Sequence, residues 1–262
     1  MNAGDHPGFH RPTSIADAAA LGSAGGDVAY LAGGHTLVPA MKTRLRAPDA
    51  LVDLTRIDGL AGISRDSDRL WIGATTRHAA VASDAAVVAA IPALARLAGG
   101  IGDPQVRNRG TLGGSVANND PAADYPAAVL ALDAIVETDR ARHAADDFFQ
   151  GMFATALGEA EIIVRIGFRV ADAAAYAKFA HPASRYALVG VFVARFGGDY
   201  RVAVTGAGPG VFRWSEAEAA LAAGAAPPSL AADDLNADIH ASADYRAHLA
   251  GVMLRRAMGD IR

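Results

Sequence analysis

Short apolar runs alternate along the chain with alanine-rich stretches, and glycine-containing turns separate them. The apolar runs have the length and composition of buried strands, and they fall at residues 28–31, 51–54, 60–64, 69–73, 135–138, 162–168, 188–196 and 200–205. The alanine-rich stretches predict helices at residues 14–22, 36–45, from 76 onward, 85–98, 121–132, 216–223 and 242–258. Residues 101–119 are polar and rich in glycine, and they predict one long loop.

Two loops stand out because each follows an apolar stretch, contains a glycine pair and ends in a hydroxyl residue. They are Ala32, Gly33, Gly34, His35 and Thr36, and Thr111, Leu112, Gly113, Gly114 and Ser115. A glycine pair permits positive φ and lets a ligand approach the backbone, and successive N–H groups of such a turn can converge on an anion. Together the loops predict a site for two linked phosphates, and thus for a dinucleotide. For either loop alone, an ordinary turn between a strand and a helix is an equally good interpretation.

Hydrogen-bonding side chains are dense on both sides of the second loop, from residue 101 to residue 126. Asp120 and Pro121 predict the cap and the first position of the helix at residues 121–132. Asp124 would then lie about one turn into that helix, where it either accepts from a ribose hydroxyl or merely favours the positive helix end. Because Asn and Asp also stabilise turns, a structural role stays open for each of these residues.

Composition excludes several classes of function. The chain has 262 residues, a hydrophobic content of 52%, a formal net charge of −4 and no cysteine. The negative charge and the scattered basic residues argue against nucleic-acid binding. Without cysteine there are no disulfides, no thiolate nucleophiles and no usual ligation of iron–sulfur clusters. The polar first residues and the lack of a long apolar stretch predict a cytoplasmic protein with no membrane span.

Familiar catalytic and nucleotide-binding motifs are not found in the sequence. The G-x-G-x-x-G pattern and the lysine-containing P-loop are absent, which argues against a Rossmann enzyme and an NTPase. His35 has no second ligand at a metal-binding spacing, so we assign it a positioning or hydrogen-bonding role and expect no metal site. No residue is assigned as catalytic, since no local signature marks one. The dispersed histidines are interpreted as surface or structural residues: His78, His143, His181, His240 and His248.

These residues make the chain resemble the FAD-binding (medium) subunits of molybdenum hydroxylases of the CO dehydrogenase/xanthine dehydrogenase type. The resemblance covers nearly the whole chain, and residues 101–125 are its most specific part. It also includes both glycine loops and residues 10–14, 72–76, 176–191 and 238–242.

The resemblance implies an α+β protein with an FAD-binding domain at residues 1–171 and a smaller domain at residues 172–262. The first domain would have the two-lobed fold of the vanillyl-alcohol oxidase/p-cresol methylhydroxylase type, with lobes at residues 1–54 and 55–171. The second would be a CO dehydrogenase flavoprotein-like C-terminal domain, a small antiparallel sheet with helices. A shift in composition at residues 172–175 agrees with this boundary.

The resemblance also implies non-covalently bound FAD, with its diphosphate held by both glycine loops. Ile101 would lie against the flavin or its linker, Asp124 would bind the polar tail of the cofactor, and Val164 would pack near the adenine or the ring system. Tyr186 occupies a position where an aromatic ring can cover one face of the flavin. The expected cofactor-binding residues are Ala32, Gly33, Gly34, His35, Thr36, Leu37, Ile101, Thr111, Leu112, Gly113, Gly114, Ser115, Asn118, Asp124, Val164 and Tyr186.

Two features depart from the family pattern. Many relatives carry a basic residue directly after the aromatic at Phe179, where it can reach the cofactor, and this chain has Ala180 there. The segment between Pro227 and Asp238 is shorter than usual, which would trim a helix of the C-terminal domain with little effect on FAD.

The implied function is that of an oxidoreductase subunit that passes electrons through FAD to NAD or another acceptor. The lack of cysteine fits a small partner chain that carries the [2Fe–2S] clusters, and a large partner would carry molybdopterin, in a heterotrimer that can dimerise. Two alternatives stay open. One is a self-sufficient flavin oxidase or reductase, for which Tyr186 and His181 are the nearby acid–base candidates. The other is a non-catalytic assembly factor that keeps the fold.

Overall fold

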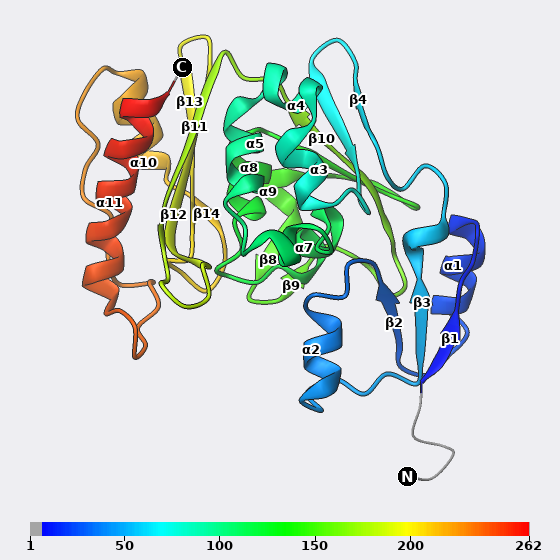
Figure 1. The fold of residues 1–262 in the computed structure, drawn as a ribbon. Helices are drawn as coiled ribbons and strands as arrows, with labels where there is room; N and C mark the ends of the chain where they lie inside the picture. The colour runs from blue at the N-terminus through cyan, green and yellow to red at the C-terminus, as the bar shows by residue number, and fades with distance from the viewer. Residues whose placement is uncertain (1–6, 262) are drawn as a thin grey trace.

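The computed structural model describes residues 7–261, and its N-terminal unit is a small parallel sheet (Figure 1). The strands are, in sheet order, β1 (Gly8–His10), β3 (Ala50–Asp53) and β2 (Val28–Leu31). Helix α1 (Ile15–Gly22) packs on this sheet and begins where the Ser14 hydroxyl accepts the amide of Asp17. Buried Val52 and Leu54 anchor a small core beneath it.

An antiparallel sheet of five strands forms the middle of the molecule (Figure 1). Its strands are, in sheet order, β4 (Ile63–Arg65), β5 (Arg69–Gly73), β10 (Ile163–Arg169), β6 (Ile135–Thr138) and β7 (Arg142–Ala144). The short helix η1 (Leu54–Arg56) leads into it from the N-terminal sheet. The helices packed beside it are α3 (His78–Ser83), α4 (Ala85–Ala90), α5 (Pro92–Gly99), α6 (Pro104–Arg107), α7 (Leu112–Asn118), α8 (Tyr125–Ala131) and α9 (Ala145–Phe148). A small hairpin, β8 (Phe149–Gly151) and β9 (Ala154–Thr155), follows α9.

The C-terminal part is an antiparallel sheet that is covered on both faces. Its strands are, in sheet order, β11 (Ala173–Ala180), β12 (Ala187–Phe196), β13 (Asp199–Thr205) and β14 (Phe212–Arg213). Phe192 and Ala203 point into the large core formed with the central helices. Val191 and Val193 instead pack on α11 (Ala243–Asp260), while α10 (Ser215–Ala222) packs against β13. Burial on both sides explains why β12 is a continuous apolar run rather than an alternating one.

The predicted α+β class is confirmed, as is the hairpin that Gly197 and Gly198 connect. The division after residue 171, with lobes at 1–54 and 55–171, stays a prediction. The large core runs across that division because it includes Phe192 and Ala194 of β12 as well as residues of the central sheet.

The prediction of one helix at residues 85–98 is wrong, because the chain breaks into α4 and α5 at Ile91. Pro92 has no N–H to donate and disfavours helical backbone at the residue before it, and Ile91 has φ −141° and ψ 74°. The predicted loop at residues 101–119 is also wrong, since it contains α6 and α7. The side chains of Asp103 and Thr111 cap these two helices.

The helix predicted at residues 121–132 begins later than expected, at Tyr125. The Asp120 carboxylate does not cap it, because it accepts the amide of Ala122 within a turn. Asp124 therefore takes the N-cap position instead of lying one turn inside the helix. The Asp124 side chain makes no capping hydrogen bond, so neither carboxylate caps α8.

Arg246 joins α11 to the C-terminal sheet. Its side chain is buried, and it donates to the carbonyl oxygens of Leu188 and Gly206 at 2.8 Å each. It also pairs with Asp238 at 2.7 Å. The guanidinium of Arg246 therefore links α11 to the start of β12, to the end of β13 and to the turn at Asp238.

We expect Arg246→Ala to lower the free energy of unfolding by about 2–4 kcal/mol, because two buried carbonyl groups lose their donor. Urea denaturation measures this change. Arg256 lies on the same helix and is exposed, so Arg256→Ala is the matched control, with an expected change below about 0.5 kcal/mol. Equal unfolding free energies for the two variants would contradict the role assigned to Arg246.

Candidate functional site

The first glycine loop offers free backbone donors. It leaves β2 at Leu31 and leads through Gly34, whose φ is +74°, into α2 (Leu37–Lys42). Within residues 7–261, the amides of residues 33–37 have no backbone or side-chain acceptor. Consecutive unpaired amides in a turn that includes a left-handed residue form a concave site for an anion.

The structure brings the second glycine loop against the first. A Cβ on Gly33 would overlap the carbonyl oxygen of Arg109 and lie 2.8 Å from the Cα of Gly110. Gly110 leads directly into Thr111, the first residue of the second loop. Two segments that are about 75 residues apart in sequence therefore touch backbone to backbone, as a single ligand with two phosphates requires.

The amides of the second loop differ from the prediction, because the protein itself uses them. Leu112 and Gly113 donate to the carbonyl oxygens of Thr76 and Ala74 at 3.0 and 2.8 Å. Ser115 donates to the Thr111 carbonyl, and the Gly114 amide faces the Thr111 hydroxyl at 3.3 Å. What this loop presents to a ligand is thus the exposed Cα of Gly114 and the Ser115 hydroxyl, not a second row of free amides.

Asp124 lies in a buried polar cluster at the start of α8. Its carboxylate accepts from the Tyr176 hydroxyl at 2.5 Å and pairs with the Lys178 ammonium at 3.0 Å. Burial raises the pKa of Asp124, and the nearby ammonium opposes that rise. Lys178 also donates to the carbonyl oxygens of Gly100 and Arg185 at 3.0 Å each. The cluster therefore joins the central helices to β11.

Other expected site residues fall near one of these two groups. Ile101 follows Gly100 and is half-buried, and the Ile101 carbonyl accepts from Arg107 at 3.0 Å. Tyr186 is 48% exposed, and burial together with the charges of Asp120 and Asp124 raises its pKa.

Val164 and Asn118 complete the expected set. Val164 accepts the amide of Ala74, which is also the residue that contacts Gly113, so Val164 borders the second loop. Asn118 is half-buried at the end of α7. The structure thus collects the expected residues around the glycine loops and the Asp124 cluster.

Sequence reasoning missed Lys178 and Tyr176. They alternate along β11 with Ala177 and Phe179, which pack on the opposite face against α11. A single lysine on one face of an alternating strand was the available signal. Ala180 lacks the basic side chain that many relatives carry there, but Lys178 places a cation two positions earlier, beside Asp124.

His78, interpreted from the sequence as a surface or structural histidine, is buried and therefore structural. A Cβ on Gly110 would lie 2.5 Å from its Nε2, so the imidazole packs directly beneath the junction of the two loops. Its ring centroid is 5.3 Å from that of buried Tyr125. Burial, then the charges of His35 and Arg107, lowers the pKa of His78 to about 4.

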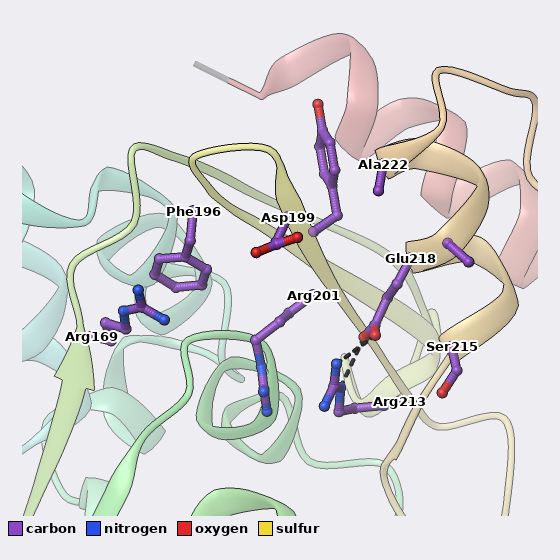
Figure 2. Close-up of a pocket in the computed structure, with 10 residues that line it drawn as sticks. Arg169, Phe196, Asp199, Arg201, Arg213, Ser215, Glu218 and Ala222 are labelled. Carbon is purple, nitrogen blue, oxygen red and sulfur yellow. Dashed lines mark hydrogen bonds and ion pairs between the residues drawn. The ribbon is translucent and has the colours of Figure 1, made fainter.

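A separate pocket of about 480 Å³ lies between β13 and α10 (Figure 2). Three arginines line it, but Arg213 is bonded to Glu218, and Arg201 to Asp146. None of the expected cofactor-binding residues borders this pocket. Because its cations are neutralised within the chain, it offers no comparable site for a diphosphate.

Among residues 7–261 no helix is long and apolar enough to cross a membrane, and no group of three or more His, Asp or Glu side chains could hold a metal ion. The two glycine loops are the candidate site for an extended anionic ligand.

The comparisons with known proteins are consistent with this geometry. The chain is 36% identical to the carbon monoxide dehydrogenase medium chain of Hydrogenophaga pseudoflava, with 95% of each chain covered. It is 35% identical to the nicotine 6-hydroxylase medium subunit of Paenarthrobacter nicotinovorans, again with 95% of each covered. A chain in the structure of quinoline 2-oxidoreductase from Pseudomonas putida 86 superposes with a TM-score of 0.88 at 28% identity, covering 97% of this chain and 96% of that one.

Residues 4–168 match the family described as the FAD binding domain in molybdopterin dehydrogenase, and the chain belongs to that family. The predicted family, its fold and its cofactor, FAD, are therefore confirmed. The residues present fit this cofactor, because the first loop provides unpaired amides where a diphosphate needs donors.

We expect Gly33→Ala to reduce the FAD retained per chain by about tenfold or more, because the new methyl group forces the two loops apart. The ratio of flavin to protein absorbance after gel filtration measures retention. Gly198→Ala is the matched control, since its Cβ would meet nothing within 4 Å. Full flavin content in Gly33→Ala would show that the contact between the loops is dispensable.

The lowered pKa of His78 predicts that the free energy of unfolding depends on pH. An ordinary histidine takes up its proton near pH 6.5, whereas His78 resists it to about pH 4, so the folded state loses stability as the pH falls through this window. We expect the wild type to lose about 2 kcal/mol more than His78→Gln when urea unfolding is compared at about pH 7.5 and about pH 5. Parallel losses in the two proteins would contradict the burial of a neutral His78.

Proposed function

We propose that this chain is the flavoprotein subunit of a molybdenum hydroxylase, which passes electrons from iron–sulfur clusters of a partner through FAD to NAD or another acceptor. The observation that carries the proposal is the row of unpaired amides at residues 33–37, pressed against the second glycine loop. Bound FAD would supply the redox chemistry.

The first loop would hold the diphosphate. Hydrogen bonds from amides to a charged phosphate contribute about 1.5–3 kcal/mol each. The hydroxyls of Thr36 and Ser115 add donors, since Thr36 makes no capping hydrogen bond within α2. Because the second loop uses its own amides internally, we assign it the task of closing the site with glycine Cα atoms.

The Asp124 cluster would set the local charge around the part of the cofactor beyond the diphosphate, which includes the flavin ring. Ile101, Asp124, Lys178 and Tyr186 come from four different segments, and the Lys178 hydrogen bonds to Gly100 and Arg185 hold these segments together. A half-buried ammonium and a buried carboxylate beside a redox cofactor influence its reduction potential through local charge. Tyr186 is exposed enough to lie over a ring system at the surface.

The partners follow from composition and from the relatives. The chain has no cysteine, so clusters of the usual kind need another chain. The relatives that match over 95% of the chain are named medium chain or medium subunit, which supports an assembly with a larger, molybdopterin-bearing chain and a smaller, [2Fe–2S]-bearing one. The cytoplasmic location and the identity of the acceptor stay predictions.

We expect the purified chain to retain FAD and to bind FMN about 100-fold more weakly or worse, because FMN lacks the second phosphate and the adenosine that follows it. Equilibrium dialysis of the flavin-free chain against each nucleotide measures both affinities. Equal affinity for FMN would contradict a diphosphate cradle. Reduction of the isolated holo-chain by a small substrate, without partner chains, would instead favour a self-sufficient flavin enzyme.

A further inference from the structure

The connection between β11 and β12 carries Tyr186 at its end, and a histidine at its start holds its shape. It runs from His181 to Tyr186, and we call it the Tyr186 turn. Residues 182–186 are all exposed, whereas β12 is buried from its first residue. The commonest hairpin connections have two residues, so this longer one depends on hydrogen bonds within it to keep one conformation.

The His181 imidazole closes the Tyr186 turn by accepting two backbone amides. The amides of Ala183 and Ser184 donate to His181 Nδ1 at 3.2 and 3.3 Å. Asn and Asp side chains close turns in the same way, by accepting amides a few residues further along the chain. A protonated imidazole has no lone pair at Nδ1. The Tyr186 turn therefore requires the neutral ring, with its proton on Nε2.

Backbone hydrogen bonds connect this closure to Tyr186. The His181 amide donates to the Tyr186 carbonyl at 2.8 Å, and the Tyr186 amide donates to the Ser184 hydroxyl at 3.3 Å. The Arg185 carbonyl accepts from Lys178 at 3.0 Å, although Arg185 itself has φ 63°. A residue other than glycine in the left-handed region persists only where the surrounding contacts hold it.

His181 is in turn held by the segment that leads into α11. The ring centroids of His181 and His240 are 4.6 Å apart, and Figure 1 shows both segments at the same end of the C-terminal sheet. The His240 amide donates to Asp238 at 2.8 Å, and Asp238 pairs with Arg246. The His181 ring is therefore fixed both by its own turn and by a segment that is anchored to α11.

These contacts decide between the roles that the sequence left open for His181. An acid–base role in a self-sufficient flavin enzyme would need a lone pair that can take a proton from a substrate. The lone pair at Nδ1 instead faces two amides, and Nε2 carries the proton. The ring is thus unsuited to act as a base, but it is well placed to order the Tyr186 turn.

We propose that His181 is a positioning residue, which closes the Tyr186 turn so that the Tyr186 ring lies against the flavin. This inference rests on the proposed function and on the place expected for Tyr186. The Tyr186 ring is 48% exposed, and on an open turn it would sample many orientations. Ordering such a ring when a ligand binds weakens binding, and a turn that is closed beforehand avoids this loss.

The first test follows the Tyr186 turn in the flavin-free chain. We expect His181→Leu to raise the hydrogen-exchange rates of the Ala183 and Ser184 amides by about fivefold or more, because these amides have no other acceptor within residues 7–261. His181→Asn should keep the rates near those of the wild type, since an asparagine can close the same turn. His248 is an exposed histidine on α11, and His248→Leu is the matched control. Unchanged rates in His181→Leu would overturn the closure.

The second test uses the full chain loaded with FAD and measures flavin fluorescence per bound FAD, which a tyrosine ring in contact with the flavin quenches. We expect Tyr186→Leu to raise this fluorescence by about threefold or more, and His181→Leu to raise it by a similar factor, because the ring leaves the flavin in both variants. His181→Asn should stay close to the wild type. The double variant His181→Leu/Tyr186→Leu should be no brighter than Tyr186→Leu, since His181 acts through the tyrosine.

The outcomes separate this inference from the proposed function. If the wild-type chain binds no FAD, the proposed function fails, and the role of His181 fails with it. If FAD is bound and Tyr186→Leu leaves the fluorescence unchanged, Tyr186 does not cover the flavin, and the inference alone is overturned. If Tyr186→Leu brightens the flavin and His181→Leu does not, the ring is in place without the histidine. A further increase in the double variant would show that His181 acts independently of Tyr186, which also overturns the inference.

Discussion

The contact between Gly33 and the backbone at Arg109–Gly110 is the constraint on which the site depends. No side chain fits between these segments, so the distance between the two loops is set by the covalent backbone alone. Residues packed directly beneath the loops maintain this distance. His78 lies against Gly110, and Ala74 lies against Gly113. The N-terminal sheet and the central helices are thereby held at one relative position. A ligand that spans them meets a preformed surface and loses little free energy in ordering it.

Much of this arrangement could be predicted from the sequence, because the signals were local. The first glycine pair, the apolar runs and the turn at Gly197 marked a loop, strands and a hairpin that the structure contains. The errors were also local in origin. A glycine pair lowers helix propensity, so α7 was taken for a loop although Thr111 caps it. Likewise, Asp120 and Pro121 predicted a capped helix start, but the helix begins at Tyr125 and the Asp120 carboxylate accepts the amide of Ala122.

The side-chain clusters were harder to foresee, since their partners are distant in sequence. Asp124 and Lys178 are separated by 54 positions, and only the pairing of the C-terminal sheet with the central helices brings them together. The same holds for the amides of Leu112 and Gly113 in the second loop, whose acceptors lie before α3. Local pattern indicates which groups can donate, but tertiary contact decides which of them remain free to bind a ligand.

Strand β12 contributes to two cores at once, with Phe192 on one face and Val193 on the other. Without the C-terminal sheet, the central helices would lose one side of their hydrophobic core. The C-terminal part and the rest of the chain should therefore unfold in one cooperative transition rather than in succession. Chimeras with related flavoproteins are therefore better made by exchanging entire chains or edge segments than by splicing at residue 171.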